Sequence, residues 1–502
     1  MKKEITASML YNLVNCPHRV TMDLYGDPAK KDPINPFIQL LWDRGNIFER
    51  EVIESLEIPF TNLHAYSDRE KERLTMEAME RGDALIYAGR IRADDLLGEP
   101  DLLRRQENGY VAGDIKSGAG EEGAGEGENG RPKKHYAVQL ALYTDILEKI
   151  GFSAGRVPFI WDVHGKEVVY DLEAPQGIRN PLSLWSEYQT ALGMARKMVK
   201  KSGTTKPALA SQCKLCHWRS ACVKRLEDLD DLTLIPELGR ARRDAMWLYI
   251  KNVRTLSESD IEEFIQGKKT VIPGVGSGKL LQFQERARLL KTRGARPYLK
   301  EAVSLPSLEK ELFFDIETDP MRDVCYLHGF VERIGGDNRT ERYVAFYADN
   351  PTPEEEEKAF ADAWEYVKAS MPCAIYYYSH YERTIWGKLH KRYPNVAEEG
   401  EIAEVFRAPE TVDLYTDIVR KKSEWPTRDH SIKTLAYYLG FNWRDTEPSG
   451  AASIEWYHRW VETKDEEIKK RILEYNEDDC IAMRVLRDAI DQLDIGPTLV
   501  FE

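Results

Sequence analysis

Hydrophobic and polar positions divide the chain into three regions with different predicted structure. Residues 1–228 combine amphipathic helical patterns with short apolar runs, and residues 229–305 are helical with two glycine-containing turns. Residues 306–502 open with an apolar strand and then alternate strand and helix patterns. At about 150 residues per domain, a chain of 502 residues also corresponds to about three domains. We therefore predict a multidomain α/β protein with these boundaries.

Composition and charge restrict what such a protein can be. Apolar residues make up 42% of the chain and charged residues 31%, which is enough apolar material for packed cores. No run of about 18 apolar residues is present, which excludes a membrane span, and no secretion signal is recognised, so we expect a cytoplasmic protein. The net charge is −14, so any nucleic-acid contact must use a local basic patch.

A short apolar run ends in the pattern Asp114-x-Lys116. On a strand, these two side chains share one face. A carboxylate and an ammonium in that arrangement suit a nuclease, because the carboxylate binds a divalent metal and the ammonium orients the attacking water. Alone, the pair is also compatible with a surface ion pair. Its surroundings favour the nuclease, since Asp101 lies upstream in a turn before a strand, and Gln139 and Tyr143 follow on one helical face.

With Glu49 on an earlier helix, the order Glu, Asp, Asp-x-Lys, Gln-x-x-x-Tyr resembles the RecB-like branch of the PD-(D/E)xK nucleases. The resemblance implies that Asp101 and Asp114 bind Mg²⁺ or Mn²⁺ and that Lys116 is the catalytic lysine. It also implies that Glu49 stands near the metal and that the Gln-x-x-x-Tyr pair positions the substrate strand.

One position departs from the pattern of that branch. Phe48 stands where a histidine usually precedes the glutamate, and phenylalanine cannot bind a metal. Either Glu49 takes over the missing role or the site is weakened. Asp94 and Asp95, in a predicted hairpin turn, are the alternatives to Asp101, and such residues are equally typical of a solvated turn.

Four cysteines have a spacing typical of a metal site. Cys213, Cys216 and Cys222 form C-x-x-C-x-x-x-x-x-C, and Cys16 lies near the N-terminus. Four thiolates suit a [4Fe–4S] cluster or tetrahedral zinc. One cysteine before the nuclease core and three after it resembles the iron–sulfur RecB-like nucleases, which include CRISPR-associated and AddB-type enzymes. The resemblance implies a [4Fe–4S] cluster, with zinc as the alternative. The remaining cysteines are predicted to be buried structural thiols: Cys325, Cys373 and Cys480.

The middle region is positively charged. Residues 236–300 contain 14 Lys and Arg but only 7 Asp and Glu. The segments 235–239 and 272–276 each predict a tight glycine turn between helices, and the pattern resembles helix-hairpin-helix modules. Backbone amides at such turns contact phosphates without reading bases, whereas an ordinary α-hairpin spacer is the alternative. The basic residues predicted to bind nucleic acid stand beside these turns: Arg240, Arg242 and Lys279.

The third region carries a second set of carboxylates. Asp315 and Glu317 share one face of the apolar strand, and two inward carboxylates repel each other unless a cation lies between them. Tyr475 and Asp479 lie one turn apart on a late helix. This combination resembles the DEDD exonucleases of the ribonuclease-H-like fold, tyrosine subtype. The resemblance implies that the three carboxylates bind two metal ions and that Tyr475 orients the attacking water.

The middle motif of that family ends in an aromatic residue followed by aspartate. Here Glu382 occupies the aspartate position, and Asp413 is the alternative.

Together these patterns predict a nuclease with two active sites. A RecB-like PD-(D/E)xK domain (1–228), a helix-hairpin-helix-like module (229–305) and a DEDD 3′–5′ exonuclease domain (306–502) would hydrolyse phosphodiesters of nucleic acid. Single-stranded or end-containing DNA is the expected partner, in repair, recombination or defence, and any motor would come from a partner helicase. Two hypotheses remain beside it. Either only the C-terminal domain is active and the first is an iron–sulfur DNA-binding module, or the protein is a non-catalytic adaptor.

Overall fold

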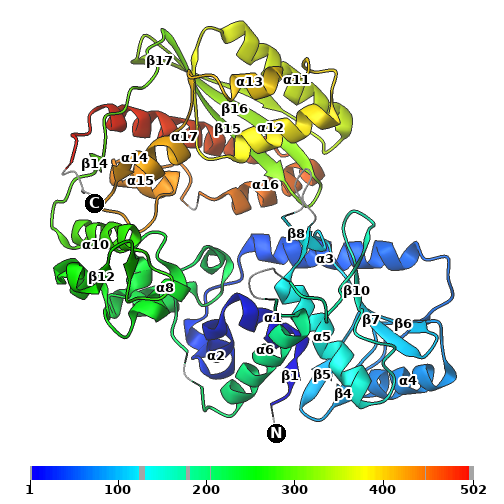
Figure 1. Ribbon diagram of the computed structural model, residues 1–502. Coiled ribbons are helices and arrows are strands. Elements are labelled where there is room, and N and C mark those ends of the chain that lie inside the picture. The colour runs from blue at the N-terminus through cyan, green and yellow to red at the C-terminus, as the bar shows by residue number, and fades with distance from the viewer. Residues whose placement is uncertain (1–2, 124–129, 177–180, 204, 447, 497–502) are drawn as a thin grey trace. The chain divides into compact units, whose positions relative to one another are not determined.

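The computed structural model describes residues 3–123, 130–176, 181–203, 205–446 and 448–496 (Figure 1). The chain forms two compact units. Unit 1 comprises Met1–Pro207 with Gln212–Cys222, and unit 2 comprises Ala208–Ser211 with Val223–Glu502. Within the described ranges, no helix is both long enough and apolar enough to cross a membrane.

Unit 1 is built on a six-stranded sheet of order β11-β10-β7-β6-β3-β2 and a smaller sheet of order β1-β5-β4. Its strands have these bounds: β1 (Ile5–Thr6), β2 (Thr61–Asn62), β3 (Leu85–Tyr87), β4 (Ile91–Ala93), β5 (Leu96–Gly98), β6 (Leu102–Gln106), β7 (Gly109–Ile115), β8 (Glu121–Glu122), β9 (Arg131–Pro132), β10 (Phe159–Trp161) and β11 (Glu167–Val169). The helical segments are α1 (Ala7–Asn15), α2 (Pro17–Tyr25), η1 (Pro28–Lys30), α3 (Pro36–Glu54), α4 (Asp68–Arg81), α5 (Lys134–Lys149) and α6 (Leu184–Val199), followed by η2 (Ser211–Leu215) and α7 (Arg219–Asp228) at the passage to unit 2.

Strand β7 is the centre of this unit because both of its faces are buried. Ala112 packs with α1, α5 and α6 in one apolar cluster, whereas Val111 and Ile115 pack on the other face with the end of α3. Gly113 is in register with Phe159 of β10, and a side chain at Gly113 would clash with that ring, 2.3 Å away. Asp114 therefore points to the same side as Ala112, toward α5.

Unit 2 contains the middle region and the C-terminal region. Its sheet has the order β17-β16-β15-β18-β19, with β15, β16 and β17 antiparallel and β18 and β19 parallel to β15. The strands are β12 (Ile265–Gln266), β13 (Lys269–Thr270), β14 (Tyr298–Leu299), β15 (Lys310–Asp319), β16 (Val324–Ile334), β17 (Asp337–Tyr347), β18 (Ala374–Tyr377), β19 (Thr411–Asp413) and β20 (Ser423–Glu424). The helices are η3 (Leu232–Leu234), α8 (Gly239–Met246), α9 (Val253–Glu258), η4 (Ile261–Phe264), α10 (Ser277–Lys291), α11 (Pro353–Ser370), α12 (Tyr381–Arg392), α13 (Glu401–Val405), η5 (Leu414–Val419), α14 (Arg420–Lys422), α15 (Ile432–Tyr438), α16 (Gly450–Thr463) and α17 (Glu466–Asp491).

Alternation along β15 separates two cores. Phe314 and Ile316 pack with α11, α12 and α13, whereas Phe313 packs on the opposite face with α17. Figure 1 shows the strand β15 and these helices. Helix α17 begins at an Asp465 cap whose side chain accepts from the amide of Glu467, and its apolar positions at helical spacing keep it on the sheet. The face of β15 that carries the predicted carboxylates is therefore the face covered by α17.

The middle region is joined to the C-terminal sheet domain by buried charge. Arg286 of α10 is fully buried and donates to Glu424 of β20 at 2.8 Å. It also donates to Glu237, which precedes α8, at 3.1 Å. Breaking such a buried pair leaves an uncompensated charge, so the pair resists separation of the two regions.

The second predicted glycine turn differs from the prediction in its setting. It was expected to connect two helices, but it connects the short strand β13 to α10. Gly274 adopts a left-handed conformation with φ of 74°, which a glycine reaches without strain. The reason for the difference is the pair of short strands β12 and β13, which the helical periodicity of the region does not indicate.

Candidate functional site

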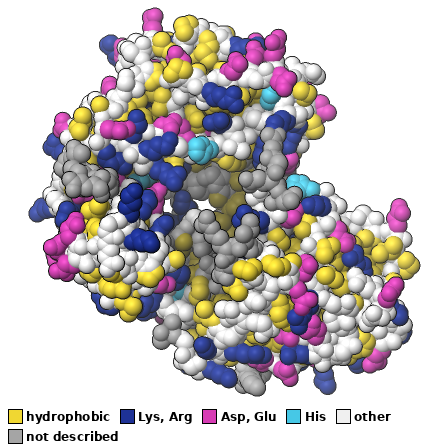
Figure 2. All heavy atoms as spheres, in the orientation of Figure 1, with side chains coloured by type: hydrophobic (Ala, Val, Ile, Leu, Met, Phe, Trp, Pro, Cys, Tyr) yellow, Lys and Arg dark blue, Asp and Glu magenta, His cyan; other side chains and the backbone are white. Residues whose placement is uncertain are grey.

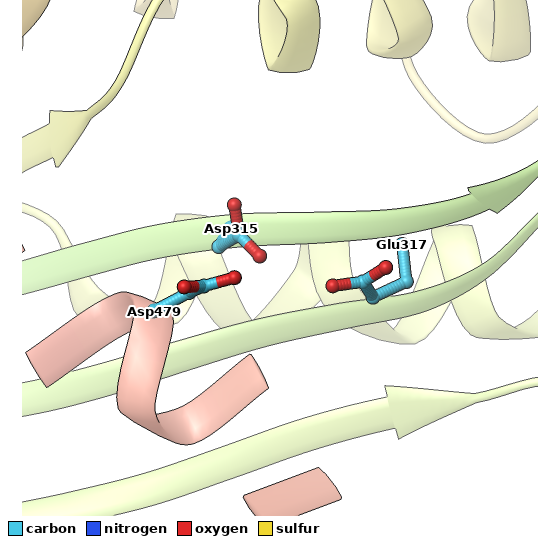
Figure 3. Close-up of side chains that lie close together, drawn as sticks. All are labelled: Asp315, Glu317 and Asp479. Atoms are coloured by element: carbon cyan, nitrogen blue, oxygen red, sulfur yellow. The ribbon is translucent and has the colours of Figure 1, made fainter. Parts of the chain in front are cut away.

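Three acidic side chains converge on the α17 face of the unit 2 sheet (Figure 3). Asp315 and Glu317 come from β15 and Asp479 comes from α17, and their ligand oxygens all lie within 4.8 Å of one another. Among the residues that the structure describes, this is the one group of three or more His, Cys, Asp or Glu side chains with that spacing. The alternation of β15 predicted the first two to share a face, and the structure places Asp479 against them.

Burial and mutual repulsion make it unfavourable for all three carboxyl groups of this centre to be ionised at once. Burial, followed by the charge of Asp479, raises the pKa of Glu317 to about 8. Burial and the neighbouring charges of Asp479 and Glu317 also raise the pKa of Asp315. A divalent cation would relieve the repulsion, and carboxylate oxygens are the ligands that Mg²⁺ and Mn²⁺ prefer. The donor set therefore fits such an ion.

A lysine that the sequence analysis did not single out completes the centre. Lys433 of α15 donates to the Tyr475 hydroxyl at 2.9 Å and to Asp479 Oδ1 at 3.1 Å. Trp443 donates its indole N–H to the same Asp479 oxygen at 2.8 Å. The one sequence signal that could have found Lys433 is its position on a helix that precedes Tyr475 and Asp479, and no signal pointed to Trp443.

The two candidates for the fourth carboxylate have different surroundings. Glu382 of α12 is 3% exposed, and its Oε2 has no hydrogen-bond partner among the described residues. Burial, together with the charges of Asp413 and Asp479, raises the pKa of Glu382. Asp413 uses Oδ1 to accept from the amides of Thr416 at 2.8 Å and Ser379 at 3.0 Å, which caps η5. Asp413 Oδ2 is also buried without a hydrogen-bond partner among the described residues, and it lies 3.6 Å from His380 Nδ1. The charge of Glu382 contributes to the raised pKa of Asp315, which favours Glu382 as the group that faces the centre.

A second acidic centre lies in unit 1. Asp114 of β7 is buried and accepts from Lys116 Nζ at 2.8 Å. Asp101, in the turn before β6, accepts from the Ile115 amide at 2.8 Å. Burial, then the charges of Asp114 and Glu49, raise the pKa of Asp101 to about 8. Burial opposes the Lys116 charge, but attraction by Asp114 and Asp101 outweighs it and raises the pKa of Lys116.

Glu49 and Phe48 have separate roles in this centre. Glu49 of α3 accepts from the Tyr87 hydroxyl at 2.9 Å and contributes to the electrostatics of Asp101. Phe48 packs against the apolar cluster that contains Tyr87, Val111 and Ile115. The position where a histidine would bind metal is thus used for packing, whereas Glu49 stands near the carboxylates.

Two further predicted residues of unit 1, Gln139 and Tyr143, lie on α5, and the charges of Asp114 and Asp101 raise the pKa of Tyr143 beyond the effect of its burial. Tyr143 of α5 is buried and donates to the carbonyl of Glu99 at 3.2 Å, two residues before Asp101. Gln139 of the same helix keeps a buried Oε1 that has no hydrogen-bond partner among the described residues. The alternatives to Asp101 lie in the β4–β5 turn and form ion pairs elsewhere: Asp94 with Lys149 and Asp95 with Arg196.

Comparison with family models covers both acidic centres. Residues 36–223 match the model of the PD-(D/E)XK nuclease superfamily, and residues 312–491 match the model of the RNase_H superfamily. The chain contains two nuclease domains. This confirms the predicted superfamily of each region, the α/β fold class and the prediction that the protein is a nuclease. A search of curated proteins found no match to the chain.

The four predicted cluster cysteines all belong to unit 1. Cys16 lies between α1 and α2, and Gln212, beside Cys213, donates to the carbonyl of Asn15 at 2.9 Å. Burial raises the pKa of the Cys216 thiol, and the nearby thiols of Cys16 and Cys213 raise it further. All four thiols are half-buried. Soft thiol donors from distant positions fit an iron–sulfur cluster or zinc.

The basic residues of the middle region lie beside the two turns. Lys279 approaches Glu237 at 3.8 Å, and Arg242 donates to the Glu237 carbonyl at 2.8 Å. Arg420 of α14 reaches the same glutamate at 3.4 Å. Figure 2 shows Lys and Arg side chains gathered over the part of unit 2 that Figure 1 labels α8, α10 and α14. Arg240, the third predicted residue, is half-buried at the start of α8.

Proposed function

We propose that the RNase H-like domain is a metal-dependent 3′–5′ exonuclease that shortens DNA from its ends. The observation that carries this proposal is the group of Asp315, Glu317 and Asp479, whose oxygens lie within 4.8 Å of one another. Lys433 and Tyr475 contact Asp479 at the same centre. Stepwise removal and 3′ polarity are supported by the resemblance of the Tyr-x-x-x-Asp motif to the tyrosine-type DEDD exonucleases.

The side chains of this centre would have different chemical roles. Divalent ions supply Lewis-acid polarisation of the phosphodiester and activation of the attacking water. Asp315, Glu317 and Asp479 would hold those ions, with Glu382 as the fourth carboxylate. The Tyr475 hydroxyl is fixed by Lys433, so it can orient the attacking water. The Lys433 ammonium places positive charge where a phosphate carries negative charge, which favours the transition state.

We propose that the PD-(D/E)XK domain is a second, separate active site. Asp101, Asp114 and Lys116 converge there, and no residue is shared with the RNase H-like centre. One observation favours the alternative of a binding-only domain. Its carboxylates do not form a second group of three with ligand oxygens within 4.8 Å among the described residues.

We further propose that the four cysteines hold a [4Fe–4S] cluster. It would tie the N-terminal helices to the segment that follows the nuclease core, and so it would close a loop of about 200 residues. Such a clip stabilises the fold by restricting the unfolded chain. Clustered thiols also fit a reducing compartment such as the cytoplasm.

The expected substrate is DNA with a single-stranded or free end. The basic side chains beside the turns at 235–239 and 272–276 would hold phosphates without reading sequence. Roles in repair, recombination or defence follow from the resemblance to RecB-like nucleases, and duplex unwinding would come from a partner helicase.

Replacing Cys216 by serine is expected to remove the cluster and to destabilise the fold. Anaerobically purified protein should be brown, with broad absorption near ~400 nm from sulfur-to-iron charge transfer. The variant should be colourless, with a melting temperature lower by ~10 °C, since a loss of several kcal/mol acts on a domain of this size. Absorption spectroscopy, iron analysis and thermal unfolding measure these effects.

Cys373→Ser is the matched control, because Cys373 is buried in the other unit. That variant should keep the brown colour. A colourless wild-type protein with one zinc per chain would overturn the cluster in favour of the zinc alternative.

Degradation of end-labelled nucleic acid tests the function as a whole. With Mg²⁺ or Mn²⁺, 5′-labelled single-stranded DNA should give a ladder of products shortened from the 3′ end, and a chelator should abolish it. Matched RNA and duplex DNA should be shortened more slowly. Immediate release of a 5′ label would contradict the 3′ polarity, and intact substrates under all conditions would favour the adaptor hypothesis.

A further inference from the structure

Three neighbouring strands and one helix meet at the rim of the RNase H-like centre. Asp315 of β15 pairs with Gly329 of β16, and Tyr343 lies on the adjacent strand β17. Asn476 of α17 lies over Gly329 and reaches both flanking strands. Its amide Nδ2 donates to Asp315 Oδ2 at 2.8 Å, and its Oδ1 accepts from the Tyr343 hydroxyl at 2.9 Å.

Only glycine at position 329 leaves room for this arrangement. A side-chain carbon built on Gly329 would lie 1.6 Å from Asn476 Oδ1 and 3.0 Å from the Tyr343 hydroxyl. Cys480, one turn after Asn476, contacts the Gly329 carbonyl at 3.5 Å. The close approach of α17 to β16 therefore depends on the missing side chain, and it is what carries the Asn476 amide to Asp315.

The hydrogen bonds fix which way the amide points. Burial, then the nearby Cys480, raise the pKa of Tyr343, so its hydroxyl stays protonated and donates. The amide atom that accepts from Tyr343 must be the oxygen, which leaves Nδ2 to face Asp315. Asn476 is fully buried, so water does not compete for either end.

We infer that Asn476 is a positioning residue that fixes the rotation of the Asp315 carboxylate for metal binding. The Tyr343 hydroxyl orients the Asn476 amide, and Gly329 leaves the space that this amide occupies. Figure 3 shows one Asp315 oxygen directed toward Asp479 and Glu317 and the other directed away. An amide N–H can bond only to an acceptor, so it also favours the ionised carboxylate that a cation needs. This inference rests on the proposed metal-dependent function of the same centre.

The hydrogen bonds from Tyr343 to Asn476 and from Asn476 to Asp315 affect metal binding, which precedes the reaction. A direct measurement of metal affinity therefore tests them. Groups that orient metal ligands typically change metal affinity by about 10- to 100-fold. Without the Tyr343 hydroxyl, the Asn476 side-chain amide can rotate by about 180°, and the Asp315 carboxylate can then rotate as well. We therefore expect the Kd for Mn²⁺ to rise by about 10-fold in Tyr343→Phe, and at least as much in Gly329→Ala.

The experiment titrates full-length protein with Mn²⁺ and follows binding by calorimetry and by the electron paramagnetic resonance of the free ion. Asp114→Asn with Lys116→Met serves as the background, so that the Asp315 centre dominates the signal. Tyr366→Phe is the matched control, because that hydroxyl donates at 3.1 Å to Glu332, outside the three acids. Melting temperatures without metal should be alike for Tyr343→Phe and Tyr366→Phe, whereas only Tyr343→Phe should bind Mn²⁺ more weakly.

Equal Mn²⁺ affinity of Tyr343→Phe and Tyr366→Phe would overturn the inference while leaving the proposed function standing. A background protein that binds no Mn²⁺ would instead contradict the proposed metal centre itself. If Gly329→Ala does not fold, the comparison of the two tyrosine variants still decides the matter.

Discussion

Replacing Asp315 by asparagine is expected to slow stepwise removal of nucleotides by about 10³-fold or more, or about 4 kcal/mol of transition-state stabilisation. Asparagine has the same shape but lacks the negative charge that binds a divalent ion. Its amide oxygen can still accept from Asn476, so the local packing is retained. Single-turnover degradation of 5′-labelled single-stranded DNA, with Mg²⁺ and with Mn²⁺, measures the loss.

Two observations separate loss of catalysis from loss of structure in that variant. Three carboxylates within 4.8 Å repel one another, so neutral asparagine is not expected to lower the melting temperature without metal. Asp362→Asn, an exposed aspartate of α11 paired with Lys358, should degrade DNA at the wild-type rate. Full activity of Asp315→Asn would mean that the RNase H-like domain is not the exonuclease.

The double variant Asp114→Asn with Lys116→Met is expected to remove a second cleavage pattern completely while leaving 3′ shortening unchanged. Asp114 holds Lys116 at 2.8 Å, and loss of both removes a metal ligand and the catalytic ammonium from one centre. The centre lies in a different unit from Asp315 and shares no residue with the acidic group there, so we expect the exonuclease ligands to be unchanged. Circular single-stranded DNA and duplexes with blocked ends isolate this activity, because an exonuclease needs a free end.

Lys166→Met with Glu121→Gln is the matched control, since it also removes an ion pair of 2.7 Å from unit 1, but one that contains no predicted site residue. It should cleave blocked substrates like the wild type. If wild-type protein itself leaves blocked substrates intact and the Asp114–Lys116 variant shortens free ends normally, the first domain is a DNA-binding module. That outcome would link Phe48, which stands where related nucleases have a histidine, to the loss of cleavage by the first domain.

Short-range periodicity accounts for the parts of each site that the sequence predicted. A strand repeats every two residues, so Asp315 and Glu317 had to share a face, as did Asp114 and Lys116. A helix repeats every 3.6 residues, so Tyr475 and Asp479 had to lie one turn apart. These relations hold for any packing of the elements, and the family models confirm the superfamilies to which they pointed.

Pairings between distant segments were outside the reach of those patterns. Lys433 and Trp443 meet Asp479 only because α15 and the segment after it pack against α17. Asn476 reaches Asp315 only because Gly329, on a third element, lets the helix approach the sheet. No spacing rule connects such residues, since their distance along the chain does not limit their distance in space.

The choice between neighbours of the same type also needed the tertiary structure. Glu382 and Asp413 were two acidic candidates for one position, and each keeps a buried oxygen without a hydrogen-bond partner among the described residues. Asp413 caps η5 with its other oxygen, whereas the charge of Glu382 acts on Asp315. The sequence by itself determined the two nuclease superfamilies and the residue pairs set by local periodicity. Tertiary packing alone decided which further side chains hold the carboxylates, because burial and hydrogen-bond partners are properties of the assembled fold.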